Sequence, residues 1–134
     1  MKEQTLVILK PDAIQTKHVG EIISRFERRG LNIDAMKMEK LTNEQIKKHY
    51  AHLIDSPYFS EISNYMMESP VIIMILSANN VIALVRQMIG KTNPEEALPG
   101  TIRADYALTV SRNIIHASDS GQSAQKEINH FFPN

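Results

Sequence analysis

An unbroken apolar run, Val71-Ile72-Ile73-Met74-Ile75-Leu76, constrains the fold of this chain most strongly. Such a run is typical of a β-strand that is covered on both faces or nearly so, because a half-exposed strand would alternate with polar residues. It is far too short to cross a membrane as a helix, which takes about 20 apolar residues. The segment Thr5 to Leu9 is rich in branched residues and stops at Lys10-Pro11-Asp12. It predicts a second buried strand that ends in a turn.

Helical signals follow and separate these strands. From Gly20 onward apolar residues recur on one helical face, and Gly30 is placed to end that helix. Thr42 and Gln45 have the spacing of a capping box, which predicts a helix that begins there and runs to about His52. Apolar spacing predicts three further helices, over residues 58–67, from Asn79-Asn80 to Gly90, and over about 120–131.

Two more predicted strands complete the order. Residues 31–41 read as a strand whose alternation slips near Ala35-Met36, and residues 106–110 as a fourth strand. Residues 90–104 hold two Gly and two Pro without a clear period, which indicates a long ordered loop of the kind that often carries function. The order favours one α+β domain over residues 1–134. We expect a ferredoxin-like sandwich, with helices on one face of a mainly antiparallel four-stranded sheet. A doubly wound parallel sheet is the competing arrangement.

Composition and charge exclude several classes of protein. The chain has no cysteine, so disulfides and thiolate metal sites are absent. Fifteen Lys and Arg residues balance fifteen Asp and Glu residues, so there is no basic excess for binding a nucleic-acid backbone, and we expect no specific nucleic-acid partner. The N-terminal residues lack the apolar core of a signal peptide. We therefore expect a cytoplasmic protein with no membrane segment.

Residues 113–120, Asn-Ile-Ile-His-Ala-Ser-Asp-Ser, concentrate polar side chains just before a predicted helix. The N-terminus of a helix attracts phosphate, and a neutral imidazole such as that of His116 can attack phosphorus. Lys10, Arg86 and Arg103 add cations, on which phosphoryl transfer depends. The simpler interpretation is that the polar residues cap the helix, that His116 is an ordinary loop histidine and that each cation is a solvated surface charge. These residues alone leave both interpretations open.

Six motifs in a fixed order decide between them. They are Lys10-Pro11-Asp12, His49-Tyr50, Ser56-Pro57-Tyr58-Phe59, Gly90-Lys91-Thr92-Asn93-Pro94, Pro99-Gly100-Thr101-Ile102-Arg103, and the segment 113–120. In this order they resemble the nucleoside diphosphate kinase family, from Gln4 to Phe132. The last motif is close to a family signature, and the ordered set makes an accidental match very unlikely.

The resemblance implies a reaction. The chain is expected to transfer the γ-phosphate of ATP or another nucleoside triphosphate to a nucleoside diphosphate, by a ping-pong mechanism through phosphorylated His116. Broad base tolerance and a role in maintaining nucleoside triphosphate pools follow from the same resemblance. Mg²⁺ is expected as the cofactor, carried by the nucleotide phosphates rather than by a metal site of the protein. A homo-oligomer is expected, either a tetramer or a hexamer built from dimers.

The resemblance also implies residue roles. In the catalytic group Lys10 and Asn113 contact the sugar, Lys10 also reaches the transferring phosphate, and Tyr50 lines the pocket. Ser118 and Glu127 support His116 through a carboxylate–hydroxyl–imidazole contact. The nucleotide-binding group adds Arg86, Thr92 and Arg103 on the phosphates, Tyr58 stacked on the base, and Ile62 and Val110 as the apolar walls of the base slot.

The sequence departs from the family pattern at a few positions. Ala117 stands where the family often has Gly, so the backbone there must avoid positive φ, and we predict a negative φ. Tyr58 replaces the common Phe, Ser56 stands where many members carry Arg, and many members continue beyond residue 134. Ser56 and the shorter C-terminus leave subunit contacts open.

The sequence also leaves open two histidines and two alternative functions. His49 and His52 have a spacing that can bind metal on a helix, but no third ligand is nearby in sequence, so we interpret them as surface histidines. A module that senses nucleotides without transferring phosphate is one alternative function, and an interaction protein that keeps the fold without activity is another. The complete set of predicted catalytic residues favours the enzyme.

Overall fold

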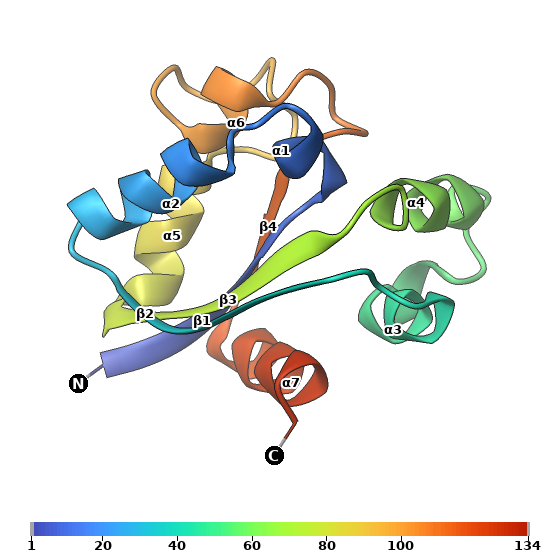
Figure 1. The fold of residues 1–134 in the computed structure, drawn as a ribbon, viewed down its shortest axis with the longest axis horizontal. Helices are drawn as coiled ribbons and strands as arrows, with labels where there is room; N and C mark the ends of the chain where they lie inside the picture. Colours follow the sequence, from blue (N-terminus) through green and yellow to red (C-terminus); the bar gives the residue numbers. More distant parts are fainter. Residues whose placement is uncertain (1, 134) are drawn as a thin grey trace.

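The computed structural model describes residues 2–133 and folds them around one four-stranded sheet (Figure 1). The strands are β1 (Lys2–Leu9), β2 (Asn32–Glu39), β3 (Val71–Asn79) and β4 (Ile115–Ala117), in the spatial order β2-β3-β1-β4. Each neighbouring pair is antiparallel. The predicted ferredoxin-like α+β sandwich is therefore confirmed, and the doubly wound parallel sheet is excluded.

Helices fill the connections between the strands. Between β1 and β2 lie α1 (Pro11–Gln15) and α2 (Val19–Arg28); between β2 and β3 lie α3 (Asn43–His49), the short 3-10 helix η1 (Ala51–Leu53) and α4 (Phe59–Met66). Between β3 and β4 lie α5 (Val81–Ile89) and α6 (Ile102–Tyr106), and α7 (Gly121–Phe131) follows β4. The predicted capping box opens α3, because the Thr42 hydroxyl accepts from the Gln45 N–H at 3.2 Å and the Gln45 side chain accepts from the Thr42 N–H at 2.9 Å.

Both faces of the sheet are covered, so the expectation of helices on one face only is wrong. Val7 and Leu9 of β1 pack with α2 and α5 on one side, whereas Leu6 and Ile8 pack with α3, α4 and α7 on the other. Figure 1 shows α7 on the side of the sheet opposite α2 and α5. This double coverage is the physical reason why β1 and β3 are apolar along both faces.

The predicted strand over residues 106–110 is also wrong. Tyr106 ends α6, and the residues after it are irregular and largely exposed at Leu108 and Val110. The fourth strand is β4, which pairs with β1 so that His116 lies opposite Ile8. A strand of three residues is too short to show an alternating pattern, whereas the apolar residues of 106–110 imitate one.

Two finer predictions are confirmed. The register of β2 against β3 shifts between Ile33 and Ala35, close to the predicted slip. Ala117 lies within β4 and is not among the residues with positive φ. Within residues 2–133, none of the helices has the length and apolar character needed to span a bilayer, and the cytoplasmic location stays a prediction.

Candidate active site

A cleft of about 830 Å³ opens beside the end of β1 and collects most of the predicted site residues. Its lining comes from segments that are far apart in the sequence, from residue 10 to residue 130. The predicted residues that line it are Lys10, Tyr50, Arg86, Thr92, Arg103, Asn113, His116 and Glu127.

His116 reaches this cleft from strand β4, so it is not the ordinary loop histidine of the simpler interpretation. Its Nε2 lies 2.9 Å from Oε1 of Glu127 on α7, and the Ser118 hydroxyl donates to the same oxygen at 2.7 Å. Burial favours the neutral acid, but the hydrogen bond and charge of His116 and the hydroxyl of Ser118 lower the pKa of Glu127 below its ordinary value. An ionised Glu127 accepts a hydrogen bond from Nε2–H. Nδ1 of His116 then carries no proton, and its lone pair is free.

Lys10 and Asn113 form a second polar pair. The buried Lys10 ammonium donates to Oδ1 of Asn113 at 2.7 Å, and the Asn113 amide donates to the Val110 carbonyl at 3.0 Å. Burial, followed by the charge of Arg103, lowers the pKa of Lys10 to about 8, although Asp12 opposes the shift. Lys10 is therefore a cation that titrates near the physiological range.

We expect binding of ATP to weaken by about 7- to 20-fold between pH 7 and pH 9.5, because a charge-assisted contact contributes about 10- to 100-fold in affinity and a small charged fraction of Lys10 persists at the upper end of this range. The affinity for ATP falls as the pH rises because Lys10, with a pKa of about 8, is charged below that pH and neutral above it. Isothermal titration calorimetry across this range measures the effect. Lys10→Met should bind more weakly at pH 7 and show a flatter profile. If the ATP affinity of Lys10→Met fell with pH as steeply as that of the unaltered chain, Lys10 would not be the charged contact that titrates.

Arg103 and Arg86 supply cations of different character. Arg103 is only 5 % exposed, and its guanidinium donates to the carbonyls of Ile115 at 2.7 Å, Gly90 at 3.0 Å and Asn113 at 3.4 Å. Burial and the neighbouring charge of Arg86 lower the pKa of Arg103 to about 10. Arg86 on α5 is exposed. Arg103 is therefore a fixed structural cation, whereas Arg86 has the freedom to adjust to a ligand.

A tight turn precedes His116. Ile114 has a φ of 70°, and the Ile115 N–H donates to the Asn113 carbonyl at 2.9 Å, which describes a γ-turn centred on Ile114. Positive φ in a β-branched residue costs about 1–3 kcal/mol, and such strain is usually found at functional sites. The Ile114 carbonyl accepts from the Lys10 N–H at 2.9 Å, so the turn joins the end of β1 to the start of β4.

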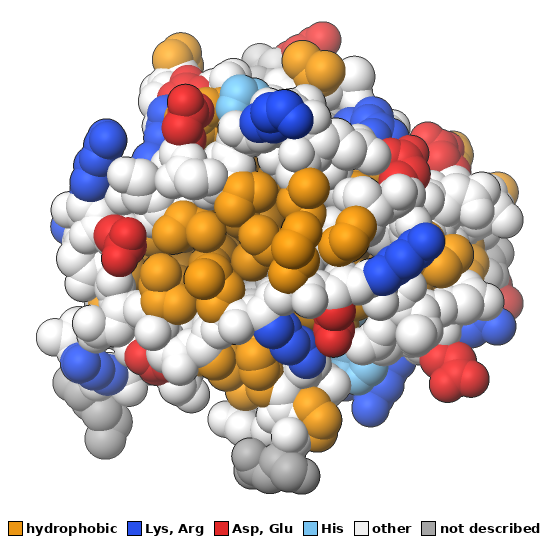
Figure 2. Space-filling model, in the orientation of Figure 1, with side chains coloured by type: hydrophobic (Ala, Val, Ile, Leu, Met, Phe, Trp, Pro, Cys, Tyr) orange, Lys and Arg blue, Asp and Glu red, His pale blue; other side chains and the backbone are white. Residues whose placement is uncertain are grey.

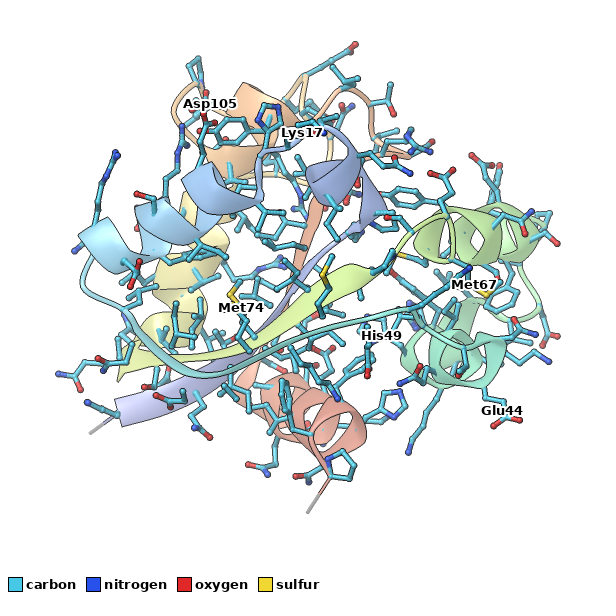
Figure 3. The ribbon with its side chains drawn as sticks, in the orientation of Figure 1. Lys17, Glu44, His49, Met67, Met74 and Asp105 are labelled. Atoms are coloured by element: carbon cyan, nitrogen blue, oxygen red, sulfur yellow. The ribbon has the colours of Figure 1, made fainter. Side chains whose placement is uncertain are left out.

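His49 is a site residue that the sequence reading missed. Its ring lies edge-to-face against that of His116, with 4.7 Å between the ring centres, and 5.5 Å from the ring of Phe131 on α7. Figure 3 shows the labelled His49 between α3 and α7. Burial and then the charge of His116 lower the pKa of His49 to about 3, so it is a neutral imidazole. The interpretation as a surface histidine is wrong, because the groups that cover His49 come from β4 and α7.

Six other polar residues line the cleft without a role assigned to them from the sequence. Asp119 belongs to the motif over residues 113–120, whereas the other five are of common surface types, so only the fold identifies them as part of the cleft. These five are Lys48, His52, Ser123, Lys126 and His130.

The predicted base slot lies outside the lined part of the cleft. Tyr58 precedes the first residue of α4 and is 67 % exposed, Ile62 is half-buried within α4, and Val110 is exposed on the segment between α6 and β4. Ser118 is buried behind Glu127 rather than on the cleft surface. The stacking role of Tyr58 stays a prediction.

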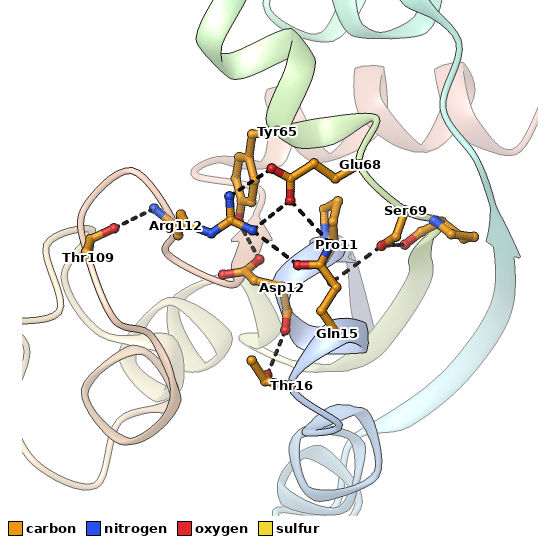
Figure 4. A network of polar contacts seen from close by, with 10 residues as sticks. Pro11, Asp12, Gln15, Thr16, Tyr65, Glu68, Ser69, Thr109 and Arg112 are labelled. Atoms are coloured by element: carbon orange, nitrogen blue, oxygen red, sulfur yellow. Dashed lines mark hydrogen bonds and ion pairs between the residues drawn. The ribbon is translucent and has the colours of Figure 1, made fainter.

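A polar network fixes the segment that carries Asn113 (Figure 4). Arg112 forms two hydrogen bonds with the Glu68 carboxylate, at 2.7 and 3.0 Å, and a third with Gln15 at 3.1 Å. Its guanidinium lies 4.9 Å from the ring centre of Tyr65, whose hydroxyl donates to Asp12. Single exposed ion pairs stabilise little, but a bidentate pair within a network holds a loop in one position.

An imidazole backed by a carboxylate, with buried and exposed cations around it, defines a site suited to phosphate groups. Known proteins give the same assignment. The model of a family described as nucleoside diphosphate kinase matches residues 3–134. The nucleoside diphosphate kinase of Methanocaldococcus jannaschii is 52% identical over 132 residues, covering 98% of this chain and 94% of that protein.

Solved structures agree with these sequence matches. The nucleoside diphosphate kinase of Aquifex aeolicus superposes with a TM-score of 0.95 at 39% identity, covering 100% of this chain and 97% of that one. The enzyme from Halobacterium salinarum, solved in complex with CDP, superposes with a TM-score of 0.96 at 34% identity, covering 100% and 90%. The chain belongs to the nucleoside diphosphate kinase family, and its activity is that of a nucleotide-binding transferase of this family.

Proposed function

We propose that this chain transfers the γ-phosphate between nucleotides by a ping-pong mechanism, with His116 as the temporary phosphate carrier. The observation that carries the proposal is the contact between Nε2 of His116 and Oε1 of Glu127 at 2.9 Å. An ionised carboxylate at Nε2 keeps the ring proton there, so Nδ1 is the nitrogen with a lone pair for attack. The contact of Ser118 with the same carboxylate supports this orientation.

Two transfers make up the cycle. The Nδ1 lone pair forms a bond to the γ-phosphorus as the bond between that phosphorus and the β–γ bridging oxygen breaks, and the nucleoside diphosphate departs. An oxygen of the acceptor's terminal phosphate then attacks the phosphohistidine, and the N–P bond breaks. Lys10, Arg86 and Arg103 stabilise the charge on the moving phosphoryl group, with Thr92 as a further phosphate contact.

The remaining predicted roles belong to the same proposal. Tyr50 lines the pocket, and burial followed by the charge of Glu127 raises the pKa of its hydroxyl to about 12, so it stays a neutral donor. Asn113 contacts the sugar together with Lys10. Broad base tolerance follows if Tyr58, Ile62 and Val110 hold the base by stacking and apolar contact, because neither reads the edge of a base. The CDP complex of the Halobacterium salinarum relative supports nucleotide binding.

In this cleft Mg²⁺ would be bound by the nucleotide phosphates rather than by protein side chains. Among the lining residues that are described, Asp119 and Glu127 are the carboxylates, and Glu127 is already bonded to His116 and Ser118. This set does not form the oxygen cage that Mg²⁺ requires. When bound to the phosphates, the ion neutralises part of their charge.

Initial-rate kinetics test the proposed mechanism. With ATP and a second nucleoside diphosphate varied together, double-reciprocal plots should be parallel, and labelled ADP should exchange into ATP without any other acceptor. A nucleotide sensor without transfer, or an inactive member with the same fold, would show no exchange. Intersecting lines with no exchange would contradict the phosphohistidine intermediate in favour of direct transfer.

We further propose that the chain forms a homo-oligomer through the open edge of its sheet. Strand β2 is an edge strand, and its side chains Met36 and Met38 are 53% and 57% exposed. Figure 2 shows hydrophobic side chains gathered across the middle of this face, over β2 and below α2. An apolar edge strand of this kind needs a cover in water, and a second copy of the chain supplies a self-complementary one.

Light scattering after size-exclusion chromatography measures this assembly. The unaltered chain is expected at a multiple of 15.2 kDa. Met36→Glu combined with Met38→Glu should shift the mass toward that of the monomer, because like charges would meet at the interface. Ile54→Glu, at an exposed apolar residue away from β2, is the matched control and should leave the mass unchanged. A monomeric unaltered chain would rule out this assembly.

A further inference from the structure

Three potential metal ligands meet at the floor of the cleft. His49 at the end of α3, His116 on β4 and Glu127 on α7 each offer one ligand atom, and these atoms all lie within 4.8 Å of one another. We propose that this cluster binds Zn²⁺ in the unphosphorylated enzyme and that the bound ion prevents phosphorylation of His116. The Zn²⁺ binding stands independently of the proposed function, whereas the block of phosphorylation rests on it.

The chemistry of the three ligands selects the ion. Two imidazole nitrogens and one carboxylate oxygen are a common ligand set for tetrahedral Zn²⁺, which leaves a fourth position for water. Mg²⁺ prefers six oxygen ligands and binds imidazole poorly. The Mg²⁺ that accompanies nucleotides is therefore not expected to occupy this cluster, even at a much higher concentration.

The geometry needs only small adjustments. With bonds of about 2.0–2.2 Å, the ligand atoms of a tetrahedral zinc site lie about 3.4 Å apart. The 2.9 Å contact between His116 and Glu127 must open slightly, and the ring of His49 must rotate toward them. The side chains of His116 and Glu127 are 23% and 17% exposed, so an ion can reach them from the cleft.

Zinc at this position removes the nucleophile. The nitrogen of His116 that faces Glu127 is Nε2, so the ion takes the Nε2 lone pair in place of the hydrogen bond. A neutral imidazole carries one ring proton, which then lies on Nδ1, and no proton is released overall. Nδ1 consequently has no lone pair for attack on phosphorus. Bound Zn²⁺ therefore prevents the attack of Nδ1 on the γ-phosphorus.

The surrounding charge limits the affinity. Lys10, Lys48, Arg86, Arg103 and Lys126 line the same cleft and oppose a dication. We therefore expect binding on the order of micromolar, well below the affinity of a structural zinc site with four protein ligands. Such a site responds to a rise in free Zn²⁺ rather than holding the ion permanently.

The test is a titration of the full, unphosphorylated chain with Zn²⁺ in competition with a chromogenic chelator. One ion per chain is expected, and Co²⁺ in its place should give the visible absorption of a four-coordinate site. His49→Asn should weaken Zn²⁺ binding by about tenfold or more, since it removes one ligand. His18→Asn is the matched control, because His18 lies outside both the cluster and the cleft, and it should keep the affinity for Zn²⁺.

Several outcomes would overturn the proposal. These are the lack of saturable Zn²⁺ binding, or His49→Asn and His49→Gln variants that bind like the unaltered chain while their circular dichroism shows a native fold. Saturating Zn²⁺ should prevent labelling of the chain by γ-labelled ATP with excess Mg²⁺, and labelling at the unaltered rate with the Zn²⁺ site filled would overturn the block. Failure to phosphorylate at all would instead refute the proposed function and leave the binding result standing.

Discussion

Replacing His116 with alanine is expected to lower kcat/KM by about 10⁴-fold or more, because the reaction loses the atom that carries the phosphate. The imidazole is half-buried and its removal leaves Glu127 bonded to Ser118, so the fold should persist. Coupled-assay kinetics with ATP and a nucleoside diphosphate measure the loss. His18→Ala, at a histidine outside the cleft, is the matched control and should retain activity.

The His116→Ala variant should lose phosphate transfer but keep its affinity for ATP. The phosphate contacts of Lys10, Arg86 and Arg103 remain in His116→Ala, so ATP affinity measured by calorimetry should change by only about threefold. A variant that kept more than about a hundredth of the normal rate would show that phosphate passes directly between nucleotides, with His116 serving only to position them.

Replacing Arg103 with alanine is expected to have the largest effect on stability. The carbonyls of Gly90 and Ile115 lose their guanidinium donor, and the Asn113 carbonyl keeps only the Ile115 N–H. Leaving buried acceptors unpaired costs about 1–3 kcal/mol each, so a loss of about 2–4 kcal/mol in the free energy of unfolding is a conservative expectation. Urea unfolding followed by circular dichroism measures it.

Arg86→Ala is the matched comparison for Arg103→Ala. Arg86 is exposed, so its removal should weaken nucleotide binding while changing the free energy of unfolding by less than about 0.5 kcal/mol. Arg103 then has a structural role besides its phosphate contact, whereas Arg86 serves the ligand alone. Equal stability of the two variants would refute the structural role of Arg103.

The sequence predicted the fold well wherever a residue's environment is set by its own element. The apolar runs of β1 and β3, the capping box at Thr42 and the Gly90 stop signal all depend on local chemistry, and the structure has each of them. The failures lie where distant segments decide. Strand β4 is defined by its pairing with β1 rather than by a pattern, so residues 106–110 imitated it.

The site shows the same division. Lys10, Arg103 and His116 were found through motifs, and the cleft brings them together. The predicted negative φ at Ala117 is confirmed, whereas the positive φ of Ile114, three residues earlier, had no signal in the sequence because the turn that links β1 to β4 imposes it. The sequence did not predict His49 as a site residue because its partners His116 and Glu127 are far away in the sequence. Spacing along a chain reveals ligand sets on one helix, but not those assembled across three elements.

The central claim is that Nδ1 of His116 carries the phosphate, and direct labelling tests it. The chain is incubated with γ-labelled ATP and Mg²⁺ without an acceptor, then desalted. We predict one label per chain, stable in alkali and lost in acid, placed on Nδ1 by ³¹P NMR and discharged by any nucleoside diphosphate. His116→Ala should take up no label. An unlabelled native chain, or a label that persists in His116→Ala, would contradict the account.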